Sequence, residues 1–371
     1  MQLLPLQEVA SQIKPGFPLA WGIRDGNGKL LLARGHRVTD AAMLSALLAR
    51  GMFVDAAEMR AAMSNHGASK PKEGFFGRWR LSSARLNTLL TTTPAELRTA
   101  LGEVVDVLIA LADRYPDKVL FQILRHDQTK LNSYGVSHSL HSAAVCCLSA
   151  RRMGWDDSRR RTLVAAAVSM NLSMIELQGR LAVQTAPPNP DQRAAIDDHP
   201  LRSAEMLRAA GVDCPLWLAA VEQHHELAGG TGYPRRLTEV GELAQALHFA
   251  DVFTAKLSAR SSRGALMPNV AARQMFTDSS GHPLAAALIK EFGIYPPGCF
   301  VRLASGEIAI VVHRGESVAT PVVACLTNSG GQAMMRPLRR DTTDKASAIV
   351  ALVADADVMV RVPWETLYPD D

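Results

Sequence analysis

The hydrophobic positions follow different patterns in three parts of the chain. Between about 84 and 295, apolar residues recur every three or four positions, as in residues 97–115. Connectors bearing Pro and Gly, such as residues 183–192, separate several of these stretches. This period is typical of amphipathic helices that pack on one another. We therefore predict a mainly α fold whose largest part, residues 84–295, is an all-α helical bundle.

The first part of the chain has a mixed pattern. The turn sequence Asp25-Gly26-Asn27-Gly28 lies between two apolar stretches and predicts a hairpin, and residues 39–52 have helical spacing. Residues 1–65 are therefore expected to form a small α/β domain. Residues 66–83 are rich in Gly and Lys and have no consistent period, so we interpret them as a linker.

The pattern changes again after Tyr295-Pro296-Pro297-Gly298. Runs rich in β-branched residues occupy 299–315, 320–327 and 358–363, interrupted by Ser-Gly and Arg-Gly turns. We therefore predict a small β domain over residues 296–371.

Composition narrows the class of protein without indicating a reaction. The 371 residues are 47% hydrophobic and 20% charged, which is a globular composition. The formal charge of +4 gives no reason to expect nucleic acid or a membrane surface as a partner. No apolar run has the ~18 to 20 residues that span a bilayer, and no basic segment precedes an apolar core at the N-terminus. The five cysteines include no CxxC pair, so we expect a cytoplasmic protein without disulfides or a Cys-type zinc site. The oligomeric state stays open.

The segment Glu222–Pro234 holds the strongest candidate for chemistry. His224 and His225 are neighbours near the end of a predicted helix, and three glycines follow within eight residues. Neighbouring residues on a helix point ~100° apart, so both imidazoles can reach one metal only if the helix ends there. Taken alone, the pair fits a polar helix end and a Gly-rich turn better than it fits a metal site.

Other segments extend the pattern. His224-His225-Glu226, followed by Gly230-x-Gly232-Tyr233-Pro234, resembles the signature of the HD-GYP family, the cyclic-di-GMP phosphodiesterase branch of the HD metal-dependent phosphohydrolases. His138-Ser139, His199-Pro200 and Asp251 resemble further marks of this family in their expected order, and the resemblance covers about residues 84–290. It implies a metal-ligand set and an adjacent loop. The ligands would be His138, His199, His224, His225 and Asp251, and the loop would contain Gly230, Gly232, Tyr233 and Pro234.

Four residues depart from the family pattern, among them Gly229, which replaces an acidic residue often found before the GxGYP glycine. Met170 and Asn171 stand where the family has its namesake His and Asp, and Met174 replaces a Lys that is implied to hold substrate phosphate. In the family the Asp bridges two metal ions, for which a carboxylate has two anionic oxygens. Asn offers one neutral carbonyl oxygen, and Met offers a soft thioether. Both side chains fit a helix, so we predict that the fold persists while the metal site is impaired.

The resemblance divides the remaining ligands unequally between two metal positions. His199, His224 and His225 would serve one position, and His138 with Asp251 would serve the other. We expect a divalent metal, Fe or Mn rather than Zn, with one ion bound and at most two. Arg260 and Arg263 match basic positions that are implied to grip substrate phosphates, and their spacing predicts a shared helical face. A solvated helix end explains this arginine pair equally well.

Two functions follow from the resemblance. The first is a degenerate HD-GYP protein of bacterial cyclic-di-GMP signalling, which binds the dinucleotide, a related nucleotide or a partner protein with weak or no hydrolysis. The alternative is an active phosphodiesterase with a reduced metal site. Loss of the His-Asp pair favours the first, whereas the five retained ligands favour the second. Because the GYP loop carries an aromatic residue among glycines, we expect it to contact a partner, for which the family suggests a diguanylate cyclase domain.

Overall fold

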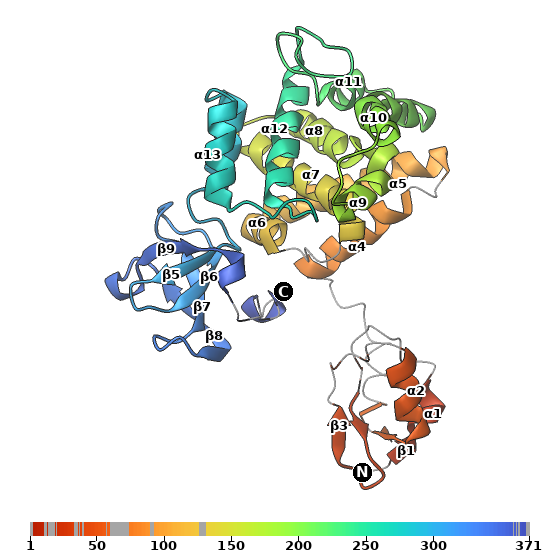
Figure 1. Ribbon diagram of the computed structural model, residues 1–371, viewed down its shortest axis with the longest axis vertical. Coiled ribbons are helices and arrows are strands. Elements are labelled where there is room, and N and C mark those ends of the chain that lie inside the picture. Colours follow the sequence, from red (N-terminus) through yellow and green to blue (C-terminus); the bar gives the residue numbers. More distant parts are fainter. Residues whose placement is uncertain are drawn as a thin grey trace. The chain divides into compact units, whose positions relative to one another are not determined.

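The computed structural model describes residues 3–10, 13, 19, 21–32, 36, 38, 41–56, 58–59, 74–89, 93–125, 131–358, 360, 362 and 364–368 (Figure 1). The chain divides into two compact units, Met1–Glu73 and Gly74–Asp371. Each unit has its own apolar core. Among the described helices, none has both the length and the apolar character needed to cross a membrane.

The first unit is a small antiparallel sheet with short helices. The predicted hairpin is confirmed: the Asp25 carboxylate accepts hydrogen bonds from the backbone N–H groups of Asn27 (2.9 Å) and Lys29 (3.0 Å). Gly28 has a φ of 81°, which a residue with a side chain rarely adopts. The strand order is β1-β4-β2-β3, and the elements are β1 (Leu3–Pro5), α1 (Leu6–Val9), β2 (Ile23–Arg24), β3 (Leu30–Leu32), α2 (Ala41–Ala49) and β4 (Phe53–Asp55).

The second unit begins with a helix that the sequence interpretation missed. Helix α4 (Phe75–Thr88) includes residues 75–83 of the predicted linker, so that part of the prediction is wrong. Its buried side chains recur at helical spacing, at Phe75, Trp79, Ser82 and Leu86. The Gly- and Lys-rich residues immediately before it concealed this period.

The predicted helical bundle is confirmed over the described part of the region. Helix α7 (Tyr134–Arg152) lies at its centre and is buried on nearly all sides from Tyr134 to Ala150 (Figure 1). A helix buried all round belongs to the interior of a bundle. The surrounding elements are α5 (Pro94–Arg114), α6 (Pro116–Arg125), η3 (Leu131–Ser133), α8 (Asp157–Ser169), η4 (Leu172–Met174), α9 (Ile175–Val183), α10 (Pro190–Ala209), α11 (Pro215–Gln223), α12 (Glu242–Leu257), α13 (Pro268–Asp278) and α14 (Pro283–Phe292).

An antiparallel sheet follows the bundle, in the order β8-β7-β6-β5-β9. The change of pattern at residues 295–298 falls between the end of α14 and the start of β5. Of the predicted run 358–363, residues 359, 361 and 363 lie outside the described residues, and the others belong to no strand. The elements are β5 (Phe300–Leu303), β6 (Ile308–His313), β7 (Val322–Thr327), β8 (Ala333–Asp341), η5 (Lys345–Ser347), β9 (Ile349–Val353), η6 (Asp355–Asp357) and η7 (Trp364–Leu367).

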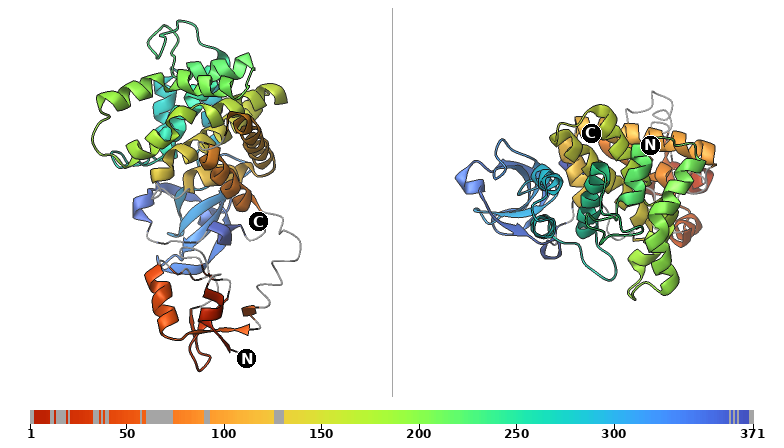
Figure 2. Two further views of the ribbon diagram at one scale, coloured as in Figure 1. Left: turned by 90° about the vertical axis from the view of Figure 1, so that its right-hand side faces the viewer. Right: turned by 90° about the horizontal axis from the view of Figure 1, so that it is seen from above.

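The sheet packs directly on the bundle (Figure 2). Phe121 of α6 belongs to the same buried cluster as Phe300 of β5, and its ring meets that of Tyr368 edge to face. Arg314, after β6, joins Asp117 of α6 (Nε–Oδ1 2.5 Å) and Glu291 of α14 (Nη1–Oε1 2.8 Å). These contacts make the helices and the sheet one compact unit.

Candidate metal centre

The five predicted ligands come together at one cavity of about 190 Å³ in the helical bundle. His138, His199, His225 and Asp251 line the cavity. The buried His224 joins them through its Nε2 atom, which lies 3.2 Å from Nε2 of His199. The remaining walls include Tyr134, Asn171, Met174, Gln178, Tyr233 and Arg260.

Three of the imidazoles form a tight group. The ligating atoms of His199, His224 and His225 all lie within 4.8 Å of one another. His224 and His225 reach the same point because α11 ends at Gln223, one residue before the pair. The helix end that the sequence required is therefore present.

Pro200 fixes the tautomer of His199. Pro200 lies inside α10 and has no N–H, so the carbonyl of Ile196, four residues earlier, lacks its usual helical donor. The Nδ1 atom of His199 lies 2.6 Å from that carbonyl oxygen. Because a carbonyl oxygen only accepts hydrogen bonds, Nδ1 carries the proton and the Nε2 lone pair of His199 points to the cluster.

The end of α11 fixes the tautomer of His224 in the same way. Its Nδ1 atom lies 2.7 Å from the carbonyl oxygen of Val221, one of the last carbonyls of the helix, which have no donor within it. His224 therefore also carries its proton on Nδ1. A hydrogen bond from the second ring nitrogen to a backbone carbonyl is the usual way in which proteins orient a metal-binding histidine.

This arrangement fits a cation. Burial lowers the pKa of His199 and lowers the pKa of His224 to about 3, so both rings are neutral at pH 7. Two unprotonated Nε2 atoms then face each other at 3.2 Å with no proton between them. A divalent metal ion would accept both lone pairs, and three imidazoles can hold such an ion. The donor set of His199, His224 and His225 therefore suits a metal.

The second pair of predicted ligands is joined by a buried hydrogen bond. Nε2 of His138 lies 2.6 Å from Oδ1 of Asp251. Burial alone would raise the pKa of Asp251, but the hydrogen bond and charge of His138 outweigh it and hold that pKa well below its usual range. Asp251 is therefore an ionised carboxylate within the cavity.

Tyr134 links His138 to the predicted phosphate ligand Arg260. Its ring stacks on the His138 ring, with centroids 5.4 Å apart and planes 13° apart. Arg260 donates from Nη2 to the Tyr134 hydroxyl (2.6 Å), and its guanidinium carbon lies 4.7 Å from the centre of that ring. The sequence interpretation did not assign Tyr134 this position, although its spacing of four residues from His138 on one helix indicates that the side chains meet.

The prediction that Arg260 and Arg263 share a helical face is wrong. Helix α12 ends at Leu257, and the two arginines pair with each other through an antiparallel bridge in the turn that follows. Arg260 lines the cavity, whereas Arg263 donates from Nη2 to the carbonyl oxygen of Ala255 (2.7 Å) and does not line it. The structure therefore supports only Arg260 as a cavity residue.

Met170 and Asn171 lie at a break between helices rather than within one. Helix α8 ends at Ser169, and η4 begins at Leu172. Met170 is fully buried in the apolar core, whereas Asn171 lines the cavity with only 2% of its surface exposed. The amide Nδ2 of Asn171 has no hydrogen-bond partner among the described residues. A neutral amide thus occupies a wall of the cavity, at the position where the sequence resemblance implies a carboxylate.

The GYP loop folds over His225. The Tyr233 ring stacks on the His225 ring, with centroids 4.6 Å apart, and lines the cavity while part of its surface stays exposed. At Gly232, a side-chain carbon would lie within 2.5 Å of the His225 carbonyl oxygen. The buried Glu226 carboxylate accepts from the backbone N–H groups of Arg235 (2.6 Å) and Leu237 (3.0 Å). Glu226 holds the loop closed, a role that the motif alone did not reveal.

Three comparisons relate the chain to known proteins. Residues 118–282 match the HD domain family. A cyclic di-GMP phosphodiesterase of Pseudomonas aeruginosa is 28% identical over 237 residues, which are 60% of this chain and 56% of that protein. The chain thus matches little more than half the length of this relative. The structure of an HDG"Y"P protein from Bdellovibrio bacteriovorus has a TM-score of 0.48 and 16% identity, covering 78% of this chain and 98% of the other. Residues 118–282 thus match an HD domain, and the HHE and GYP segments of the chain resemble those of the HD-GYP branch.

Proposed function

We propose that the protein binds cyclic di-GMP at a metal site built on three histidines, and that it hydrolyses the dinucleotide weakly or not at all. The observation that carries this proposal is Asn171, a neutral and almost fully buried amide in the cavity wall. Two metal ions a few ångströms apart need an anionic bridge to offset their repulsion, and an amide cannot supply one.

His199, His224 and His225 would hold the ion, and Fe or Mn rather than Zn remains our prediction for its identity. A bound divalent ion would supply positive charge and Lewis acidity next to a substrate phosphate. The chain's own contribution is to keep all three rings neutral and aimed at one point. Burial keeps the rings neutral, Pro200 and the end of α11 orient His199 and His224, and the stacked Tyr233 ring supports His225.

Arg260 is our candidate for holding the phosphodiester. It is the one guanidinium among the described residues that line the cavity, and Tyr134 fixes its direction. Met174 also lines the cavity and brings no positive charge. A volume of about 190 Å³ lies below the ~300 to 1,000 Å³ of pockets that enclose a whole ligand. We therefore expect a phosphate and its ribose to enter while the bases stay outside.

One observation favours the alternative, an active phosphodiesterase. His138 and the ionised Asp251 lie in the same cavity and could bind a second ion if their 2.6 Å hydrogen bond opened. The P. aeruginosa relative carries this activity in its name, which keeps hydrolysis as the second candidate. A cyclase partner that contacts the GYP loop stays a prediction, because Tyr233 lines the cavity and only part of its surface is open to a partner.

The test compares metal content, dinucleotide affinity and product formation in Asn171→Asp and in the double variant Met170→His/Asn171→Asp. We expect the unaltered protein to bind about one ion and cyclic di-GMP with little product. Restoring the carboxylate should raise the metal content towards two ions and the turnover at least tenfold. Asn189→Asp is the matched control, because this N-cap residue lies outside the cavity and Asp caps helices equally well.

The outcomes separate the candidates. Rapid hydrolysis by the unaltered protein that disappears in His225→Ala would favour the phosphodiesterase. If neither binding nor hydrolysis of cyclic di-GMP were detected in the metal-loaded protein, both candidates would be wrong. If the restored variants kept the original metal content, the placement of Asn171 in the metal site would be contradicted.

A further inference from the structure

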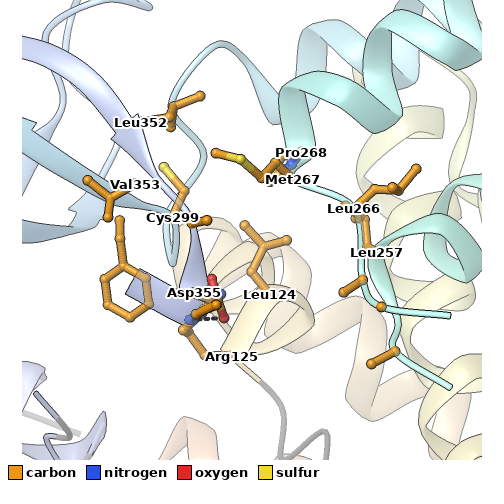
Figure 3. Close-up of a pocket in the computed structure, with 16 residues that line it drawn as sticks. Leu124, Arg125, Leu257, Leu266, Met267, Pro268, Cys299, Leu352, Val353 and Asp355 are labelled. Atoms are coloured by element: carbon orange, nitrogen blue, oxygen red, sulfur yellow. Dashed lines mark hydrogen bonds and ion pairs between the residues drawn. The ribbon is translucent and has the colours of Figure 1, made fainter. Parts of the chain in front are cut away.

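A second and larger cavity, of about 340 Å³, lies between the sheet and the helical bundle (Figure 3). Leu352, Val353 and Cys299 lie on the side of the sheet, and Leu257 and Leu266 face them from the bundle. An engineered cavity of ~150 Å³ with similar aliphatic walls holds one benzene ring. This cavity therefore has room for a fused pair of aromatic rings or a chain of comparable volume.

The polar groups of the cavity restrict the charge of its ligand. Arg125 and Asp355 are the two charged side chains among the described lining residues, and they pair through two contacts, Nη1–Oδ2 at 2.7 Å and Nη2–Oδ1 at 2.9 Å. Arg125 also covers the Phe300 ring at 4.6 Å. Because the pair neutralises itself, the cavity attracts neither anions nor cations strongly. The Asp355 side chain is 58% exposed and can accept one further hydrogen bond.

A single chain segment, residues 257–266, contributes to the walls of both this cavity and the metal cavity. Leu257, Ala259 and Leu266 line the larger cavity, whereas Arg260, within the same segment, lines the metal cavity. Ser261 to Gly264 are exposed, and the segment is anchored by a few hydrogen bonds, including that from Leu266 N–H to the Lys256 carbonyl (2.9 Å). A ligand packed against Leu257 and Leu266 would add apolar contacts at the two ends of this segment, whose middle residues are exposed.

We propose that this cavity binds a small uncharged molecule with a fused aromatic or similarly bulky apolar body and one hydrogen-bond donor, and that binding further restrains residues 258–267, the segment that carries Arg260. The donor would bond to Asp355, and the apolar body would lie between Leu352 and Leu266. The ligand would thus regulate the anion-binding arginine from outside the metal cavity. This inference does not depend on the identity of the nucleotide bound there.

The binding test uses 2-naphthol as the probe and the full chain as the protein, with fluorescence titration as the readout. We expect saturable binding of 2-naphthol and at least tenfold weaker binding of 2-naphthalenesulfonate, which has the same rings and a negative charge. Leu352→Trp and Ala265→Phe each place a ring in the cavity and should abolish binding. Ala265 lies in an exposed loop, so its variant should still fold if Leu352→Trp does not. Val350→Trp is the control, because Val350 is 60% exposed on the same strand and does not line the cavity.

Hydrogen–deuterium exchange tests the coupling. Saturating 2-naphthol should slow the exchange of residues 258–267 at least threefold in the unaltered protein and in Val350→Trp, and should not slow it in Ala265→Phe. Equal binding of the probe by the unaltered protein and Ala265→Phe would overturn the site. Binding without any change of exchange in residues 258–267 would overturn the regulatory role. Both results are readable whether or not the protein binds cyclic di-GMP.

Discussion

Replacing Pro200 by alanine should make the metal-free protein more stable and its metal binding weaker. Pro200 leaves the Ile196 carbonyl without a helical donor, and His199 uses that carbonyl to hold its proton on Nδ1. The alanine of the Pro200→Ala variant would supply a backbone N–H to the same oxygen. His199 would then lose its exclusive partner, and its ring could adopt the other tautomer or turn away from His224.

The two effects have opposite signs and can be estimated separately. Proline in a helix interior costs ~3 kcal/mol relative to alanine, and the bond lost by His199 is worth about 1 kcal/mol. The free energy of unfolding of the metal-free variant should therefore rise by about 2 kcal/mol. Loss of the group that orients a metal ligand typically lowers metal affinity by about 10- to 100-fold, equivalent to roughly 1.4 to 2.8 kcal/mol.

Urea denaturation of metal-free protein and calorimetric titration with Mn²⁺ measure the two quantities. Pro190→Ala is the control, since this proline occupies the first turn of the same helix, where no N–H is needed. We expect Pro190→Ala to leave Mn²⁺ affinity unchanged. If Pro200→Ala bound Mn²⁺ as tightly as the unaltered protein, the tautomer argument for His199 would be refuted.

Three further predictions concern the same cavity. Burial lowers the pKa of His224 to about 3, so below pH 6.5 the unfolded chain binds a proton there that the folded protein does not. Lowering the pH from 7 to 5 should therefore reduce the free energy of unfolding of the metal-free protein by at least about 2 kcal/mol, as measured by urea denaturation. A free energy of unfolding that did not change between these pH values would contradict this. Tyr134→Phe removes the acceptor of Arg260 and should weaken pyrophosphate binding about threefold to tenfold in calorimetry while leaving metal content unchanged; an unchanged affinity would show that Arg260 needs no such support. Glu226→Gln weakens the hydrogen bonds that close the loop over His225. This variant should lose about 1 to 2 kcal/mol of stability in thermal unfolding and should bind Mn²⁺ more weakly. The control Glu205→Gln, at an exposed site, should change neither quantity.

The helical region could be predicted because its period is local. Apolar spacing of three and four residues directly indicates which face of a helix is buried, and α5 and α7 have the expected pattern. The same reasoning failed at the ends of elements. Helix α4 begins directly after a Gly- and Lys-rich stretch, and α12 stops at Leu257, three residues before Arg260. The i, i+3 rule brings two arginines together only while the helix continues.

The candidate site shows the same division between local and distant information. The fixed proton on His199 follows from the His-Pro sequence once the helix continues through the proline, because the carbonyl that a helical proline leaves free lies four residues earlier. The approach of His199 to His224 depends on how α10 packs against the end of α11, which no local pattern determines. The motif resemblance supplied that long-range information, but it could not indicate which way Tyr233 turns.

Charge balance explains why the Asn at position 171 affects the number of bound metal ions more than the Met at position 170 does. Apart from the histidines, Asp251 and Arg260 are the charged side chains among the described residues lining the metal cavity, and their charges cancel. One divalent ion would bring the cavity to +2, of which a bound phosphodiester would offset one charge. A second ion would bring it to +4 among buried side chains, where like charges repel strongly. An Asp at position 171 would remove one of these charges and bridge the ions, whereas Met170, buried in the apolar core, makes no such contribution. We therefore expect Asn171, rather than Met170, to limit the protein to one ion.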